Sequence, residues 1–91
     1  MTVRVQLPPV LRFVMGDSKF VEANGATITD LLGDLARKHP QLGLHFFDEQ
    51  GAIRHNIVFL HGGVLVRAKE ASTHRVNDDD ELVVTNALAG G

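Results

Sequence analysis

The chain has 91 residues, with 9 Lys plus Arg, 11 Asp plus Glu and no cysteine. This length supports one domain with one core, and the net charge of −2 provides no basic field for nucleic acid or an anionic membrane. The lack of cysteine excludes disulfides, thiolate catalysis and iron–sulfur ligation by this chain. There is no signal-peptide pattern or long apolar run, which predicts a cytoplasmic protein.

The first part of the sequence predicts three extended runs that include a hairpin. Apolar and polar residues alternate from Val3 to Leu7, as in a strand with one buried face. Pro8-Pro9 ends this strand, because proline has no backbone N–H to donate. We expect further extended runs at residues 11–14 and 19–23, with the turn of the hairpin between them.

The next segment predicts an amphipathic helix at about residues 28–39. Thr27 is a suitable N-cap, and Asp30 stands three positions later, close to a capping box. Pro40 ends the helix. The apolar residues that share one helical face are Ile28, Leu31, Leu32, Leu35 and Ala36.

The second half of the chain predicts three more strands. Residues 41–52 are expected to be irregular, and the candidates there to cover the helix end are Leu42, Leu44, Phe46 and Phe47. The predicted strands are 53–60, 64–66 and 81–85, with turns at 61–63 and 77–80 and an inward anchor at Val76. This element order predicts an α+β fold with the helix packed across one face of the sheet.

Three groups of residues suggest chemistry but have a simpler structural explanation. None of the five histidines is paired at the helical i, i+4 spacing, which favours surface histidines over a metal site at His39, His45, His55, His61 and His74. His61-Gly62-Gly63 lacks the Lys-Ser/Thr of a phosphate-binding loop, so it is interpreted as a turn. The run from Asp78 to Glu81 is better explained as a solvated turn than as a site for a cation or basic patch.

Alternating residues in the later strands predict a second apolar face. Val58 and Leu60 should face away from Ile57 and Phe59, and Val83 away from its neighbours Leu82 and Val84. One set packs on the helix. The other set forms a patch suited to protein binding if loops leave it exposed.

The last five residues, Ala87-Leu88-Ala89-Gly90-Gly91, follow the final strand without a predicted helix or cap. We therefore expect a domain at 1–86 and a tail at 87–91 that projects into solvent. Two glycines make the narrowest backbone available, which can enter a slot that rejects side chains. The carboxylate of Gly91 becomes reactive if a partner adenylates it. Alternatively, the glycines are merely frayed or remain from processing.

Together these segments resemble the β-grasp, ubiquitin-like sulfur carriers of the ThiS/MoaD type, and among them the CysO-like carriers. The resemblance covers nearly the whole chain and is carried by Val3-Arg4-Val5, Thr27 to Leu32 with Leu35, Asp78 to Val83 and residues 87–91. It implies a mixed sheet of four to five strands with one main helix across it. Two residues depart from the pattern: Asp79 replaces the usual glycine and strains the turn slightly, and Asn86 replaces a common proline.

The resemblance implies a sulfur carrier that is a co-substrate and not an enzyme. A ubiquitin-activating-like adenylyltransferase would take up the tail through Ala87, Leu88, Ala89 and Gly90 and use ATP and Mg to adenylate Gly91. Sulfide or a persulfide from a sulfurtransferase or other source would then leave a thiocarboxylate for a biosynthetic enzyme. The chain itself would bind no cofactor or metal. Carriers of this type serve cysteine, thiamin, molybdopterin and specialised products.

Two other functions remain open from the sequence. The first is a ubiquitin-like modifier that is conjugated to lysines through Gly91, because conjugation needs the same activated tail. The second is a non-catalytic interaction domain, such as a regulatory module on a larger enzyme, for which the tail is incidental.

Overall fold

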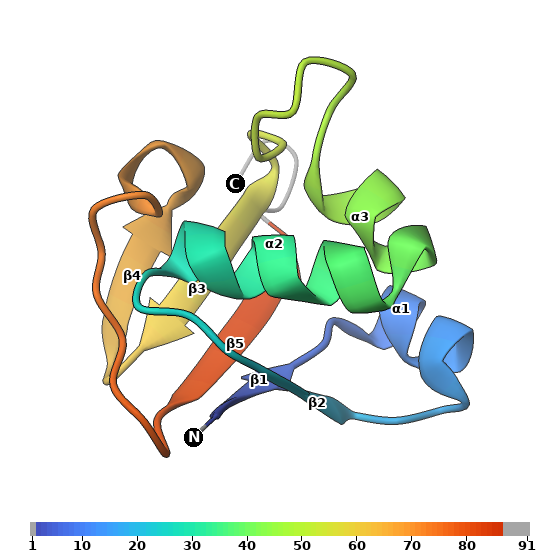
Figure 1. The fold of residues 1–91 in the computed structure, drawn as a ribbon, viewed down its shortest axis with the longest axis horizontal. Coiled ribbons are helices and arrows are strands. Elements are labelled where there is room, and N and C mark those ends of the chain that lie inside the picture. The colour runs from blue at the N-terminus through green and yellow to red at the C-terminus, as the bar shows by residue number, and fades with distance from the viewer. Residues whose placement is uncertain (1, 87–91) are drawn as a thin grey trace.

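The computed structural model describes residues 2–86. One five-stranded sheet has the order β2-β1-β5-β3-β4, and helix α2 lies across it (Figure 1). Strands β1 and β5 run parallel, and the other neighbouring pairs run antiparallel. The strands are β1 (Val3–Gln6), β2 (Phe20–Ala23), β3 (Ile57–His61), β4 (Val64–Arg67) and β5 (Glu81–Asn86). The predicted α+β arrangement is confirmed.

Helix α2 (Ile28–Lys38) begins where the sequence predicts. The hydroxyl of Thr27 accepts a hydrogen bond from the backbone N–H of Asp30 at 3.2 Å, which satisfies one of the free donors of the first turn. The apolar face of the helix packs on the sheet because burial removes its side chains from water. Its fully buried residues are Ile28, Leu31, Leu32 and Leu35, and those beneath them in the sheet include Val5, Phe59 and Leu82.

The predicted strand at residues 11–14 is wrong. This segment forms α1 (Pro9–Arg12), followed by the short 3-10 helix η1 (Phe13–Met15). Pro9 occupies the first helical position, where its missing N–H costs nothing and its fixed φ suits a helix. A short apolar run does not distinguish strand from helix, and here the single buried residue of α1, Leu11, is enough to direct the turn inward.

The predicted irregular stretch at 41–52 is also partly wrong, because α3 (Pro40–Phe46) occupies its first half. Pro40 ends one helix and starts the next from the first position. Leu42 and Phe46, four residues apart on one face, are fully buried, which confirms that they cover the helix end. Leu44 is exposed.

Strand β3 starts later than predicted, and the turns lie where expected. Ile53 makes only an isolated bridge with Phe47, so the continuous strand begins at Ile57. The turn after β3 places Gly62 and Gly63 at positive φ, as two-residue hairpin loops require. Asp79 also has a φ of 68°, which favours glycine and confirms the expected strain in that turn. No helix within residues 2–86 is long and apolar enough to cross a bilayer.

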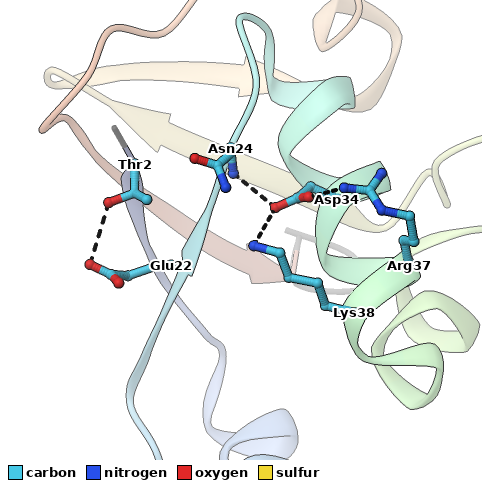
Figure 2. Close-up of polar contacts among 6 residues, drawn as sticks. All are labelled: Thr2, Glu22, Asn24, Asp34, Arg37 and Lys38. Atoms are coloured by element: carbon cyan, nitrogen blue, oxygen red, sulfur yellow. Dashed lines mark hydrogen bonds and ion pairs between the residues drawn. The ribbon is translucent and has the colours of Figure 1, made fainter.

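Asp34 fastens the connection between β2 and α2 (Figure 2). Its carboxylate is buried and accepts a hydrogen bond from the backbone N–H of Asn24 at 2.9 Å. It also pairs with Nζ of Lys38 at 2.7 Å and with Arg37. The hydrogen bond from Lys38, followed by that from Asn24, holds the pKa of Asp34 below its ordinary value, although burial opposes this shift.

Candidate functional site

The candidate site lies at the end of β5, where the predicted tail leaves the domain. The residues proposed from the sequence as reactive or partner-binding are Ala87, Leu88, Ala89, Gly90 and Gly91, and they lie outside the described residues. The last described residue is Asn86. The geometry of the site is therefore that of the strand and surface from which the tail departs.

Strand β5 is held on both edges, so the starting point of the tail is fixed. It pairs with β1 from Glu81 to Val83 and with β3 from Leu82 to Asn86. Leu82 and Val84 point into the core. Because Asn86 is itself in register with Ile57 at the start of β3, the domain holds the base of the tail in one position.

A groove of about 320 Å³ opens beside Asn86. Residues of α1 and α3 line it, and both helices appear near the C-terminal end of α2 in Figure 1. Val10 and Leu44 on these walls are 55% and 75% exposed, respectively. The apolar residues that form the deeper part are Leu11, Phe46, Ile57 and Val84. We call this feature the exit groove.

Arg54 holds one wall of the exit groove in place. Its Nε and Nη2 donate hydrogen bonds to the carbonyl oxygen of Leu44, at 3.3 and 3.1 Å. Its backbone N–H donates to the carbonyl oxygen of Phe46 at 2.9 Å. These bonds satisfy carbonyls near the C-terminal end of α3, and they hold the backbone of Leu44 at the edge of the groove.

A second apolar surface lies on the sheet face turned away from α2. Leu60 and Leu65 are directly opposite each other on β3 and β4, and Leu60 is also opposite Val83 on β5. Leu60 is 40% exposed and Leu65 is 54% exposed, whereas Phe59 on the other face is fully buried. The predicted alternation is confirmed, and part of the outward face is open to solvent.

The sequence predicts surface histidines, and the structure confirms this for only some of them. His45 and His55 are exposed, but His61 and His74 are half-buried and bonded to each other. Nδ1 of His61 lies 2.8 Å from Nε2 of His74, and its Nε2 lies 2.8 Å from Oδ2 of Asp80. Within residues 2–86, no group of three or more His, Asp or Glu side chains is arranged to hold a metal ion.

Asp80 connects this histidine pair to the turn before β5. Its carboxylate accepts a hydrogen bond from the backbone N–H of Asn77 at 2.8 Å. That bond, and next the one with His61, keep the pKa of Asp80 below its ordinary value. The acidic turn therefore has a structural role at the start of β5, at the opposite end of the strand from Asn86.

The exit groove was missed in the sequence because its walls were predicted as strand and loop. The signal that could have found it is the position of the prolines. Pro9 and Pro40 each stand at the first residue of a short helix, where proline is favoured. Interpreting both prolines as helix starts predicts that Val10 and Leu44 lie on helices. It does not predict that the two residues line the same groove.

Comparisons with known proteins agree on one family. A sequence model of the ThiS family matches residues 5–91. A chain of the Amycolatopsis orientalis BexX/CysO complex is 27% identical with a TM-score of 0.78, over 98% of this chain and 99% of that one. Small archaeal modifier protein SAMP1 of Haloferax volcanii is 26% identical with a TM-score of 0.80, over 100% of both chains.

A third structure supports the fold alone. CysO of Mycobacterium tuberculosis is 20% identical with a TM-score of 0.77, over 94% of this chain and 99% of that one. Together the three structures confirm the predicted β-grasp, ubiquitin-like fold. No curated protein sequence gives a significant match.

Proposed function

This chain belongs to the ThiS family and is a ubiquitin-like sulfur carrier, and we propose that it carries sulfur as a thiocarboxylate on Gly91. The observation that carries the proposal is that the family match extends through the terminal Gly90-Gly91. The fixed base of the tail at Asn86 also supports it, because a firmly paired strand can present five small or apolar residues to a partner.

The proposed chemistry begins on a partner enzyme. An oxygen of the Gly91 carboxylate attacks the α-phosphorus of ATP, which releases pyrophosphate and leaves an acyl adenylate. Hydrosulfide then attacks the carbonyl carbon, AMP leaves, and a thiocarboxylate remains. The narrow diglycine allows the carbonyl to enter a site that a side chain would block. Mg would bind the ATP in the partner's site and not in this chain.

The chain's own residues supply recognition and positioning, which makes it a co-substrate of other enzymes. We propose three partners: a ubiquitin-activating-like adenylyltransferase, a sulfurtransferase or other sulfide source, and a biosynthetic enzyme that accepts the sulfur. The complex named for the similar CysO chain of A. orientalis supports the use of a partner protein. A cytoplasmic location is part of the same proposal, because the cycle consumes ATP.

A second function, conjugation to lysines through Gly91, has one observation in its favour. The similar chain from H. volcanii is named a small archaeal modifier protein. Both functions require an activated Gly91, so they differ in the final acceptor. A denaturing gel of cell extract probed for this protein separates them, since conjugation gives a ladder of heavier species and carriage gives a single band.

Intact-protein mass spectrometry tests the proposed thiocarboxylate. The purified chain is incubated with ATP, Mg, sulfide and a candidate adenylyltransferase, and we expect a mass gain equal to the exchange of one oxygen for sulfur. A variant without Gly91 should show no gain, while its melting temperature stays that of the parent. Full thiocarboxylation of the shortened variant would assign the reaction to another group and overturn the proposal.

A further inference from the structure

We propose that the exit groove is the docking site for the enzyme that adenylates Gly91, and that it receives a bulky apolar side chain of that enzyme between Val10 and Leu44. This inference rests on the proposed function and deepens it. It assigns the recognition of the activating enzyme to a particular surface of the domain, beside Asn86, the last residue before the tail.

The first argument is the short reach of the tail. Gly91 stands five residues after Asn86, and five fully extended residues span about 17 Å. An enzyme that encloses Gly91 in an ATP site uses part of this length inside its own surface. That surface must therefore approach Asn86 closely, and Asn86 lines the exit groove.

The second argument is the chemistry of the groove. Val10 and Leu44, which are 55% and 75% exposed, line the groove together with the buried Ile57 and Val84. Its volume of about 320 Å³ is large enough for one large side chain. Exposed apolar residues gathered around a concave surface are typical of a binding site, and the matching occupant is an apolar anchor.

The third argument concerns the polar groups at the rim. Arg54 directs two N–H groups to the carbonyl of Leu44, and a guanidinium carries five such donors. Arg54 lines the groove together with Asn56 and Asn86, whose side chains also carry amide donors. They can bind backbone carbonyls that flank the anchor, so the groove combines an apolar contact with groups that set its orientation.

Substitutions on the groove walls test the proposal, and the chain provides a matched control. Val10→Glu and Leu44→Glu place a charge where the anchor should sit. Val64→Glu changes the same residue type as Val10 at the same exposure of 55%. Val64 is opposite His61, which is in turn opposite Leu82, so it lies near the end of the sheet remote from Asn86.

The measurement is ATP–pyrophosphate exchange by the purified activating enzyme, with the carrier concentration varied. We expect each groove variant to raise KM for the carrier about tenfold or more, as loss of an interface anchor does. The kcat should stay within about twofold, because the variants leave the tail intact, and Val64→Glu should leave both constants unchanged. Melting temperatures close to the parent's establish that the variants fold.

Three results would overturn the docking proposal. An unchanged KM for both groove variants would show that the enzyme does not use the groove. An equal rise in KM for Val64→Glu would show that any added surface charge has the same effect. If deletion of residues 87–91 changes the methyl NMR chemical shifts of Val10 and Leu44, the groove is occupied by the chain's own tail and not by the enzyme. Exchange that survives deletion of Gly91 would instead refute the proposed function itself.

Discussion

The two ends of β5 are built in opposite ways. At its start, the backbone N–H of Arg4 donates to the carbonyl of Asp80 at 3.0 Å, and that of Asp79 donates to Thr2 at 2.9 Å. The side chain of Asp80 adds its bonds to His61 and Asn77. At its finish, Asn86 adjoins a groove whose walls leave Val10 and Leu44 largely exposed.

We infer from this difference that the start of β5 contributes mainly to stability and that its finish contributes mainly to recognition. The polar groups at the start of β5 satisfy one another, so they join the ends of neighbouring strands and fix the register. Val10 and Leu44, which line the groove beside the finish, remain 55% and 75% exposed to solvent. Substitutions near the start should therefore change the free energy of unfolding, and those near the finish should change binding.

The largest effect on stability should come from the buried core near the start of β5. Leu82→Ala removes a fully buried side chain and should lower the free energy of unfolding by about 2–5 kcal/mol. Leu44→Ala, at the finish, should change it by less than about 0.5 kcal/mol. Urea denaturation measures both. An equal decrease in the free energy of unfolding of the two variants would contradict the proposed difference between the two ends of β5.

The bond between Asp34 and Asn24 should give the next largest effect. Asn24 directly follows Ala23, which is opposite Val3, at the end of the sheet where β5 starts. The backbone N–H of Asn24 donates to the buried Asp34 (Figure 2). Asp34→Ala should lower the free energy of unfolding by roughly 1–2 kcal/mol, because it removes this bond and the partners of two cations. Asp30→Ala, an exposed residue on the same helix, is the control, and an equal loss there would contradict the prediction.

Acid should lower the free energy of unfolding by protonating Asp80 at the start of β5. The pKa of Asp80 is lower in the folded protein than its ordinary value, so its contribution is complete above the unfolded value of about 3.9 and disappears as the pH falls below it. Urea denaturation at pH 7 and pH 3 should show a smaller difference for Asp80→Asn than for the parent. Asp78→Asn, in the same turn, should behave as the parent does. An unchanged difference in Asp80→Asn would refute this role.

The smallest effect should be a gain at Asp79. Its φ of 68° lies in the left-handed region, where glycine has no Cβ clash. Asp79→Gly keeps the backbone bond to Thr2 and should raise the free energy of unfolding by less than about 1 kcal/mol, since the added freedom of the unfolded chain offsets part of the relief. Thermal denaturation checks the sign, and a clear decrease would show that the Asp79 side chain stabilises the turn.

Local patterns were sufficient to predict much of this molecule from its sequence. The spacing of Leu31, Leu32 and Leu35 and the cap at Thr27 predict α2 almost to the residue, because both signals act within one or two helical turns. Alternation along β5 correctly separates Leu82 from Val83. The similarity to sulfur carriers rested mainly on the terminal diglycine, and the family match bears out the family.

Other features depend on contacts between distant segments and were decided only in the folded state. The pairing of His61 with His74 and Asp80 joins the end of β3 to two positions in the segment between β4 and β5, which no local pattern links. The exit groove requires Val10, Leu44 and Asn86 to meet, although they come from α1, α3 and β5. The sequence by itself determined the main helix, the family and the approximate places of the five strands, whereas tertiary packing turned the predicted strand at 11–14 into helix and decided which apolar residues stay exposed beside Asn86. The physical reason is that burial depends on the whole packed arrangement, and sequence periodicity reports only one element at a time.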